Sequence, residues 1–177
     1  MIVVDIGCQP QGREESITKL CEAFKPSILF GFDPHPALQP GVELHDHSVP
    51  RRRRERWGQT IIVRSRLAAW TLDGFLPFRE TGITSGVEPG NFSVPIVPCF
   101  DLVAWLRTLP MPETPVVVKM DCEGAEYPLC VAIVESALDL LIDEMLIEWH
   151  PEQTAHGMFM AKRPKLRCPV DDWEANW

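Results

Sequence analysis

Carboxylate side chains follow two short apolar runs near the start of the chain. Residues 1–7 read M-I-V-V-D-I-G, ending in Asp5 and Gly7, and residues 27–36 read S-I-L-F-G-F-D-P-H-P, with Asp33 after its apolar run. In an open parallel sheet the ligand crevice lies outside the carboxyl ends of the strands, so these residues are expected to line one crevice. A glycine turn allows the backbone to approach a ligand closely, and a carboxylate accepts hydrogen bonds from ribose hydroxyls. The pattern therefore indicates a nucleoside ligand.

A second acidic group, K-M-D-C-E-G-A-E, spans residues 119–126. Asp121 follows the apolar run at 115–120, so its carboxylate is expected to face the same crevice. There it could orient a substrate or act as a general base, particularly where neighbouring carboxylates raise its pKa. Glu123 and Glu126 also suit a helix N-terminus, where the helix dipole favours negative charge. We expect Asp121 to be functional, Glu126 to be structural, and Lys119 to pair with one of these acids.

Histidines offer two further possibilities. His150 follows a fifth apolar run, with Glu148 two residues earlier on the same face, and is a candidate base at the mouth of the crevice. A polar residue at a strand end is an equal alternative. His45, Asp46 and His47 are residue types that bind first-row metals. Alternation along a strand would place both histidines on one face, but no third ligand beside them is identifiable. We therefore expect a solvated loop there and no metal site.

The arginine run at 51–54 could bind phosphate or nucleic acid. The formal net charge of −8 argues against general nucleic-acid binding, which depends on neutralising phosphates. A solvated loop is therefore favoured, and the run remains a hint that the substrate is anionic.

Apolar periodicity and turn signals predict the elements that position these residues. Helices are expected at 14–25, 100–109 and 125–141. Strands are expected at 1–7, 27–33, 60–63 (running on towards residue 70), 115–120 and 143–149, with a hairpin at 71–78. Residues 34–57 are expected to form loop and short helix, residues 81–98 a long excursion, and residues 152–177 a tail without clear strand alternation.

Composition predicts one domain with an ordinary core, since the chain has 177 residues, of which 45% are hydrophobic. No apolar run approaches the roughly 20 residues that a membrane span needs. Met1 leads directly into a strand, so we expect no secretory signal. The six cysteines lack C-x-x-C spacing and are expected to be reduced thiols in the cytoplasm.

Three segments in order resemble the FkbM-type S-adenosylmethionine-dependent methyltransferases. They are Asp5-Ile6-Gly7, Phe32-Asp33-Pro34-His35-Pro36 and the K-x-D-x-E-G-x-E match at 119–126, supported by Ala68-Ala69-Trp70, Asp73-Gly74 and residues 147–150. The resemblance covers about residues 1–151. It implies a Rossmann-like class I methyltransferase, an α/β fold with a mostly parallel sheet, helices on both faces and abbreviated ends. Cys8-Gln9 stands where Ala-Asn is typical of the family, and Asp33 replaces the usual glutamate.

The resemblance also implies roles for individual residues. S-adenosylmethionine would be held at its methionine end by Asp5, Gly7 and Cys8, and at its ribose by Asp33, with Pro34 fixing the turn. Ala68 and Ala69 would pack against adenine, and Asp121 would face the sulfonium. The implied catalytic residues are Asp121, Glu123 and His150.

The expected activity is methyl transfer to a hydroxyl of a small molecule or sugar, without a nucleic-acid or membrane partner. Two alternatives stay open: a nucleic-acid methyltransferase or binding module that uses the arginine run, and a non-catalytic nucleotide-binding or interaction protein. A nicotinamide dehydrogenase is disfavoured because G-x-G-x-x-G is absent. The acceptor and the oligomeric state are not indicated.

Overall fold

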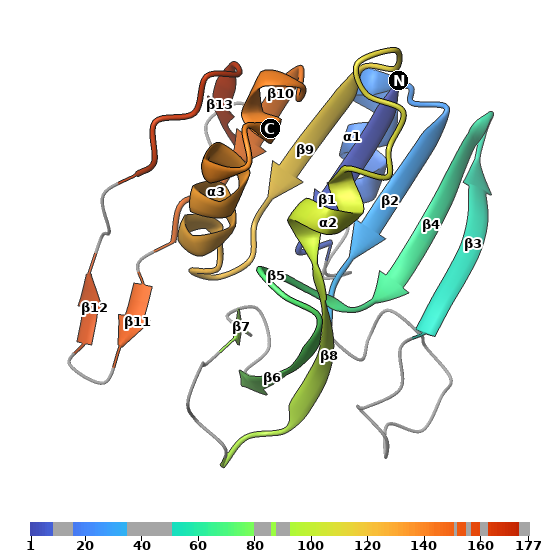
Figure 1. Cartoon of the computed structure of the whole chain (residues 1–177). Helices are drawn as coiled ribbons and strands as arrows, with labels where there is room; N and C mark the ends of the chain where they lie inside the picture. Colours follow the sequence, from blue (N-terminus) through green and yellow to red (C-terminus); the bar gives the residue numbers. More distant parts are fainter. Residues whose placement is uncertain are drawn as a thin grey trace.

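A seven-stranded sheet is the centre of the computed structural model, which describes residues 1–8, 16–34, 51–79, 86–87, 93–150, 152–154, 157–159 and 163–173. The strands lie in the order β13 (Val170–Asp172), β10 (Glu144–Ile147), β9 (Val116–Met120), β1 (Ile2–Ile6), β2 (Ile28–Phe32), β4 (Thr60–Arg66) and β3 (Arg51–Trp57) (Figure 1). Neighbouring strands are parallel except β3 and β4. Without β3, this is the strand order of a doubly wound Rossmann-like sheet.

Helices cover both faces of this sheet. All five residues of β1 and of β9 are buried, as expected for parallel strands between two helical layers. Along β1, Ile2, Val4 and Ile6 pack on the side of α2 (Leu102–Leu106) and α3 (Glu126–Glu135), whereas Val3 packs on the side of α1 (Ser16–Phe24). The predicted α/β class, with a mostly parallel sheet between helices, is therefore confirmed.

Two of the predicted helices are shorter than expected. α3 ends at Glu135 because Ala137 adopts a left-handed conformation (φ 61°), and a 3-10 turn at Leu138–Leu140 replaces the predicted continuation. α2 begins only at Leu102, since residues up to Asp101 belong to β8 (Ile96–Asp101). The Asp101 carboxylate caps α2 by accepting the Ala104 N–H at 2.9 Å.

The hairpin predicted at 71–78 is wrong. β5 (Ala68–Trp70) and β6 (Gly74–Arg79) do not pair with each other, because β8 lies between them, parallel to β5 and antiparallel to β6. β7 (Gly86–Val87) completes this four-stranded sheet within the region expected to be a long excursion. Non-local pairing with β8 has replaced the local turn.

Strands also occupy two regions where none was expected. The arginine run belongs to β3, which returns to β4 through a turn at Gly58 (φ 57°), so its assignment to a loop is wrong. In the tail, β11 (Glu152–Thr154) pairs with β12 (Gly157–Phe159), and β13 joins the main sheet beside β10. No helix among the described residues is long and apolar enough to cross a membrane.

Candidate functional site

The residues that follow four parallel strands lie along one edge of the main sheet. Main-chain hydrogen bonds continue the sheet one residue beyond the strands: Gly7 N to Phe32 O (2.9 Å), Asp121 N to Ile6 O (3.0 Å), Glu148 N to Met120 O (2.9 Å) and Asp33 N to Ser65 O (3.2 Å). The predicted residues Gly7, Asp33 and Asp121 are thus brought to the same edge. The order of strands reverses between β1 and β9, and ligands of open α/β sheets bind outside the carboxyl ends at such a point.

Gly7 occupies the position at this reversal where no side chain fits. Its φ of +80° is in the left-handed region, and a Cβ there would overlap the carbonyl oxygen of Asp121 and lie 2.6 Å from its carbonyl carbon. The turn after β1 therefore packs directly on the loop after β9, and it requires glycine.

A buried ion pair fixes the two loops beneath this contact. The Lys119 Nζ lies 3.2 Å from Asp5 Oδ1 and donates to Asp121 Oδ2 (3.1 Å) and to the Gly7 carbonyl (3.0 Å). The Ser16 hydroxyl donates to Asp5 Oδ2 at 2.6 Å. Burial lowers the pKa of Lys119, but the carboxylates of Asp5 and Asp121 outweigh it and raise that pKa above its ordinary value. Lys119 pairs with an acid as predicted, and it bridges two of them.

Asp5 and Cys8 are both directed into the protein. Both oxygens of the Asp5 carboxylate have protein partners, so the geometry gives no support to its direct contact with a ligand ammonium, which stays a prediction. The Cys8 thiol is fully buried among core residues on the α1 side, and burial first, then the Asp5 charge, raises its pKa. Any contribution of Cys8 to a ligand site must come from its main chain.

The remaining predicted cofactor residues lie in three environments. Asp33 is buried (5% exposed) directly after the carboxyl end of β2. The Pro34 carbonyl accepts a hydrogen bond from Arg66 Nε at 3.3 Å, which fixes the turn beyond β2. Ala68 and Ala69 are buried, Ala68 against the second sheet and Ala69 in the main core. Their contact with adenine stays a prediction.

A group of acidic side chains surrounds His150 on the β9–β10 side of the crevice. The His150 Nε2 lies 3.2 Å from Glu148 Oε1, 3.8 Å from Glu123 Oε1 and 3.9 Å from Asp121 Oδ1, and Nδ1 lies 3.1 Å from Glu126 Oε1. The three predicted catalytic residues, Asp121, Glu123 and His150, are therefore neighbours. Burial lowers the pKa of His150, but the hydrogen bond and charge of Glu126, with the other carboxylates, raise it to about 9.

Glu126 is the buried member of this acidic group and holds its neighbours in place through hydrogen bonds. Its carboxylate is fully buried and accepts the N–H groups of Cys122 (2.6 Å) and Gly124 (2.8 Å) as well as the His150 contact. Glu123 has φ of 52° within this turn, an uncommon conformation for a glutamate. Glu126 is thus structural, as expected, and it also orients the imidazole.

Two contacts of the candidate site were not predicted from the sequence. Trp173, which follows β13 in the tail, is buried on the α1 side with its ring centroid 5.4 Å from Lys119 Nζ, and no pattern in the tail indicated this return. The contact of His150 with Glu126 was also missed, although the acidic spacing at 121–126 could have suggested it. His45, Asp46 and His47 lie outside the described residues.

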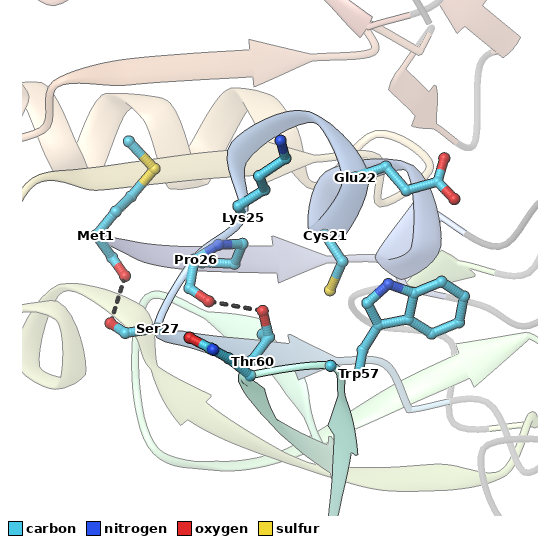
Figure 2. A pocket seen from close by; sticks show the side chains of 10 residues that line it. Met1, Cys21, Glu22, Lys25, Pro26, Ser27, Trp57 and Thr60 are labelled. Atoms are coloured by element: carbon cyan, nitrogen blue, oxygen red, sulfur yellow. Dashed lines mark hydrogen bonds between the residues drawn. The ribbon is translucent and has the colours of Figure 1, made fainter.

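A separate pocket of about 690 Å³ lies at the opposite edge of the sheet (Figure 2). Hydrogen bonds from Ser27 Oγ to Met1 O (2.8 Å) and from Thr60 Oγ1 to Pro26 O (2.6 Å) join the starts of β1, β2 and β4 beside it. Its lining residues are Met1, Cys21, Glu22, Lys25, Pro26, Ser27, Trp57, Gly58, Gln59 and Thr60. No predicted site residue lines it, and the predicted residues gather instead at the carboxyl ends of the strands, which are the better candidate.

No protein-family model matches the chain, and no curated protein or solved structure is significantly similar to it.

Proposed function

We propose that the protein is an S-adenosylmethionine-dependent methyltransferase that acts on a hydroxyl of a small molecule or sugar. The observation that carries the proposal is the glycine turn at Gly7, which lies at the reversal of strand order with the buried Asp33 at the end of the neighbouring strand. This combination suits a ligand with an adenosine portion, because ligands of open α/β sheets bind at the reversal of strand order and a carboxylate there accepts hydrogen bonds from ribose hydroxyls.

The residues at the crevice fit the proposed cofactor in part. Glycine at position 7 lets the turn pack on the Asp121 main chain and so fixes the turn, and Asp33 would accept hydrogen bonds from the ribose. Lys119 holds Asp5, Asp121 and the Gly7 carbonyl in one arrangement, so it would preserve the shape of the turn before binding. The bound cofactor would supply an electrophilic methyl group.

The acidic group on the β9–β10 side would position the acceptor. Since the carboxylates raise the pKa of His150 to about 9, the imidazole is in its doubly protonated, positively charged form at neutral pH unless another cation replaces the added proton. The partly exposed carboxylates of Asp121 and Glu123 would then remove the proton from the substrate hydroxyl that receives the methyl group. Holding the hydroxyl in line with the methyl donor would supply most of the rate enhancement.

Calorimetric titration with S-adenosylmethionine and S-adenosylhomocysteine tests the proposal. We expect micromolar binding that Asp33→Asn weakens roughly 10- to 150-fold, the range for losing a hydrogen bond to a charged group. Glu113→Gln is a matched control, because Glu113 is exposed in the turn that precedes β9 at the other edge. Thermal unfolding of each variant checks folding. Absence of binding by the unmodified protein contradicts the proposal.

A second candidate is binding or methylation of nucleic acid. The register of β3 and β4 places Arg51 opposite Arg66 and Arg53 opposite Arg64. Arginines of both strands therefore share this side of the sheet, a concentration of positive charge that suits a phosphate-bearing ligand. RNA or DNA binding with a steep salt dependence, weakened by replacing the exposed Arg54 with glutamine, would support this candidate.

A further inference from the structure

The imidazole of His150 and the carboxylates of Asp121 and Glu123 form a three-residue group open to solvent. One ligand atom from each lies within 4.8 Å of the other two, and their side chains are 17%, 28% and 21% exposed. We propose that these residues bind one divalent cation of the Mn²⁺ class at the carboxyl ends of β9 and β10, with Glu148 as a further ligand.

The spacing of the donor atoms suits a shared ion. Two ligands about 2.1 Å from one ion lie about 3.0 Å apart at a right angle and about 3.4 Å apart at the tetrahedral angle. The His150 Nε2 lies 3.8 Å from Glu123 Oε1, 3.9 Å from Asp121 Oδ1 and 3.2 Å from Glu148 Oε1. Small side-chain movements would therefore bring these atoms into contact with one ion.

Glu126 gives the imidazole the orientation that a metal ligand needs. An ionised carboxylate only accepts hydrogen bonds, so the 3.1 Å contact with Glu126 Oε1 makes His150 Nδ1 the donor. This leaves Nε2 facing the other carboxylates, where a metal ion that displaces its proton would bind. A histidine held by a buried carboxylate on one nitrogen and bound to metal through the other is a recurring arrangement in metalloproteins.

The charge of the group also favours a cation. Asp121, Glu123, Glu126 and Glu148 bring four carboxylates to one imidazole, and the nearby Lys119 is shared with Asp5. Carboxylate oxygens suit Mg²⁺, Ca²⁺ and Mn²⁺, whereas imidazole suits later first-row metals. Two carboxylates with one imidazole therefore favour Mn²⁺ over Mg²⁺ or Ca²⁺.

The site would have open coordination positions facing the crevice. If the proposed function holds, on which this step rests, an acceptor with neighbouring hydroxyls would bind the ion through its oxygens, and the ion would lower the pKa of the reacting hydroxyl. Cation binding itself does not depend on the proposed function.

Mn²⁺ titration of chelator-treated protein tests the site, with free Mn²⁺ followed by electron paramagnetic resonance. At a pH of about 8 the ion must displace the proton of His150, because metal ligands bind in their deprotonated form. We expect one ion per chain, and we expect Glu123→Gln and His150→Gln each to weaken binding at least about tenfold, as even outer partners of metal ligands do. Glu135→Gln, which changes an exposed carboxylate at the end of α3, is expected to leave Mn²⁺ binding unchanged.

Absence of saturable Mn²⁺ binding by the unmodified protein overturns the proposal, as does equal binding by the Glu123 and His150 variants. Competition with Mg²⁺, Ca²⁺ and Zn²⁺ identifies the preferred ion, and preference for Mg²⁺ or Ca²⁺ overturns the assignment to the Mn²⁺ class. Mn²⁺ binding without S-adenosylmethionine binding supports the metal site and contradicts the methyltransferase function, so the two failures are distinguishable.

Discussion

Replacing Gly7 with alanine tests the contact on which the crevice depends. The structure imposes two costs on this variant. A left-handed φ of +80° costs an L-residue roughly 1–2 kcal/mol, and forcing a methyl group against the Asp121 carbonyl adds the 1–3 kcal/mol typical of overpacking. We therefore expect the free energy of unfolding to fall by about 2–5 kcal/mol.

Gly58→Ala is the matched control for this prediction. Gly58 also has a positive φ (57°), but a Cβ there would meet no atom within 4 Å. Gly58→Ala is expected to lower the free energy of unfolding by only about 1–2 kcal/mol, the cost of the left-handed backbone conformation. Both variants also reduce the entropy of the unfolded chain equally, so that effect cancels in the comparison. Urea unfolding followed by tryptophan fluorescence measures both, and equal losses would refute the close packing of Gly7 on Asp121.

Three further predictions concern buried groups. Lys119→Met leaves Asp5 buried without its cation and is expected to lower the free energy of unfolding by about 3–5 kcal/mol. The double variant Lys119→Met/Asp5→Asn is expected to recover part of this loss. Urea unfolding measures both, and no recovery in the double variant would contradict the pairing. Arg167 donates a hydrogen bond to Asp139 and lowers the pKa of that carboxyl. This pair therefore stabilises the fold above the ordinary aspartate pKa, and the stabilisation is lost as the pH falls through the lower pKa of the folded state. Asp139→Asn should flatten the acid side of a curve of Tm against pH, and an unchanged curve would contradict this pairing. The buried thiols of Cys8 and Cys130, whose pKa values burial raises, should react with an aromatic disulfide reagent only after unfolding, and their rapid labelling in the native protein, detected by mass spectrometry, would contradict their burial.

The central strands and their carboxyl-end residues could be predicted because their signals are local. β1 and β9 are apolar apart from Asp5 and Lys119, and each ends near a carboxylate that the parallel arrangement brings to one edge. The spacing of Asp121 and Glu123 after one strand, and of His150 after the next, was sufficient to place the acidic group.

The errors arose where distant pairing decided the structure. The arginine run shows no apolar alternation, yet it forms β3 because an edge strand needs only β4 as a partner and leaves Arg54 and Arg56 exposed. The Asp73-Gly74 turn signal indicated a hairpin, but β8 from far along the chain pairs with both flanking strands. The burial of Trp173 beside Lys119 likewise depends on β13 returning to the main sheet.

A crystal structure with S-adenosylhomocysteine would show where the chain binds the cofactor. We expect the ligand outside the carboxyl ends of β1 and β9, against the Gly7 turn, with its ribose hydroxyls bonded to Asp33. A ligand seated instead in the pocket beside Trp57 and Thr60, or no ligand at saturating concentration, would contradict it.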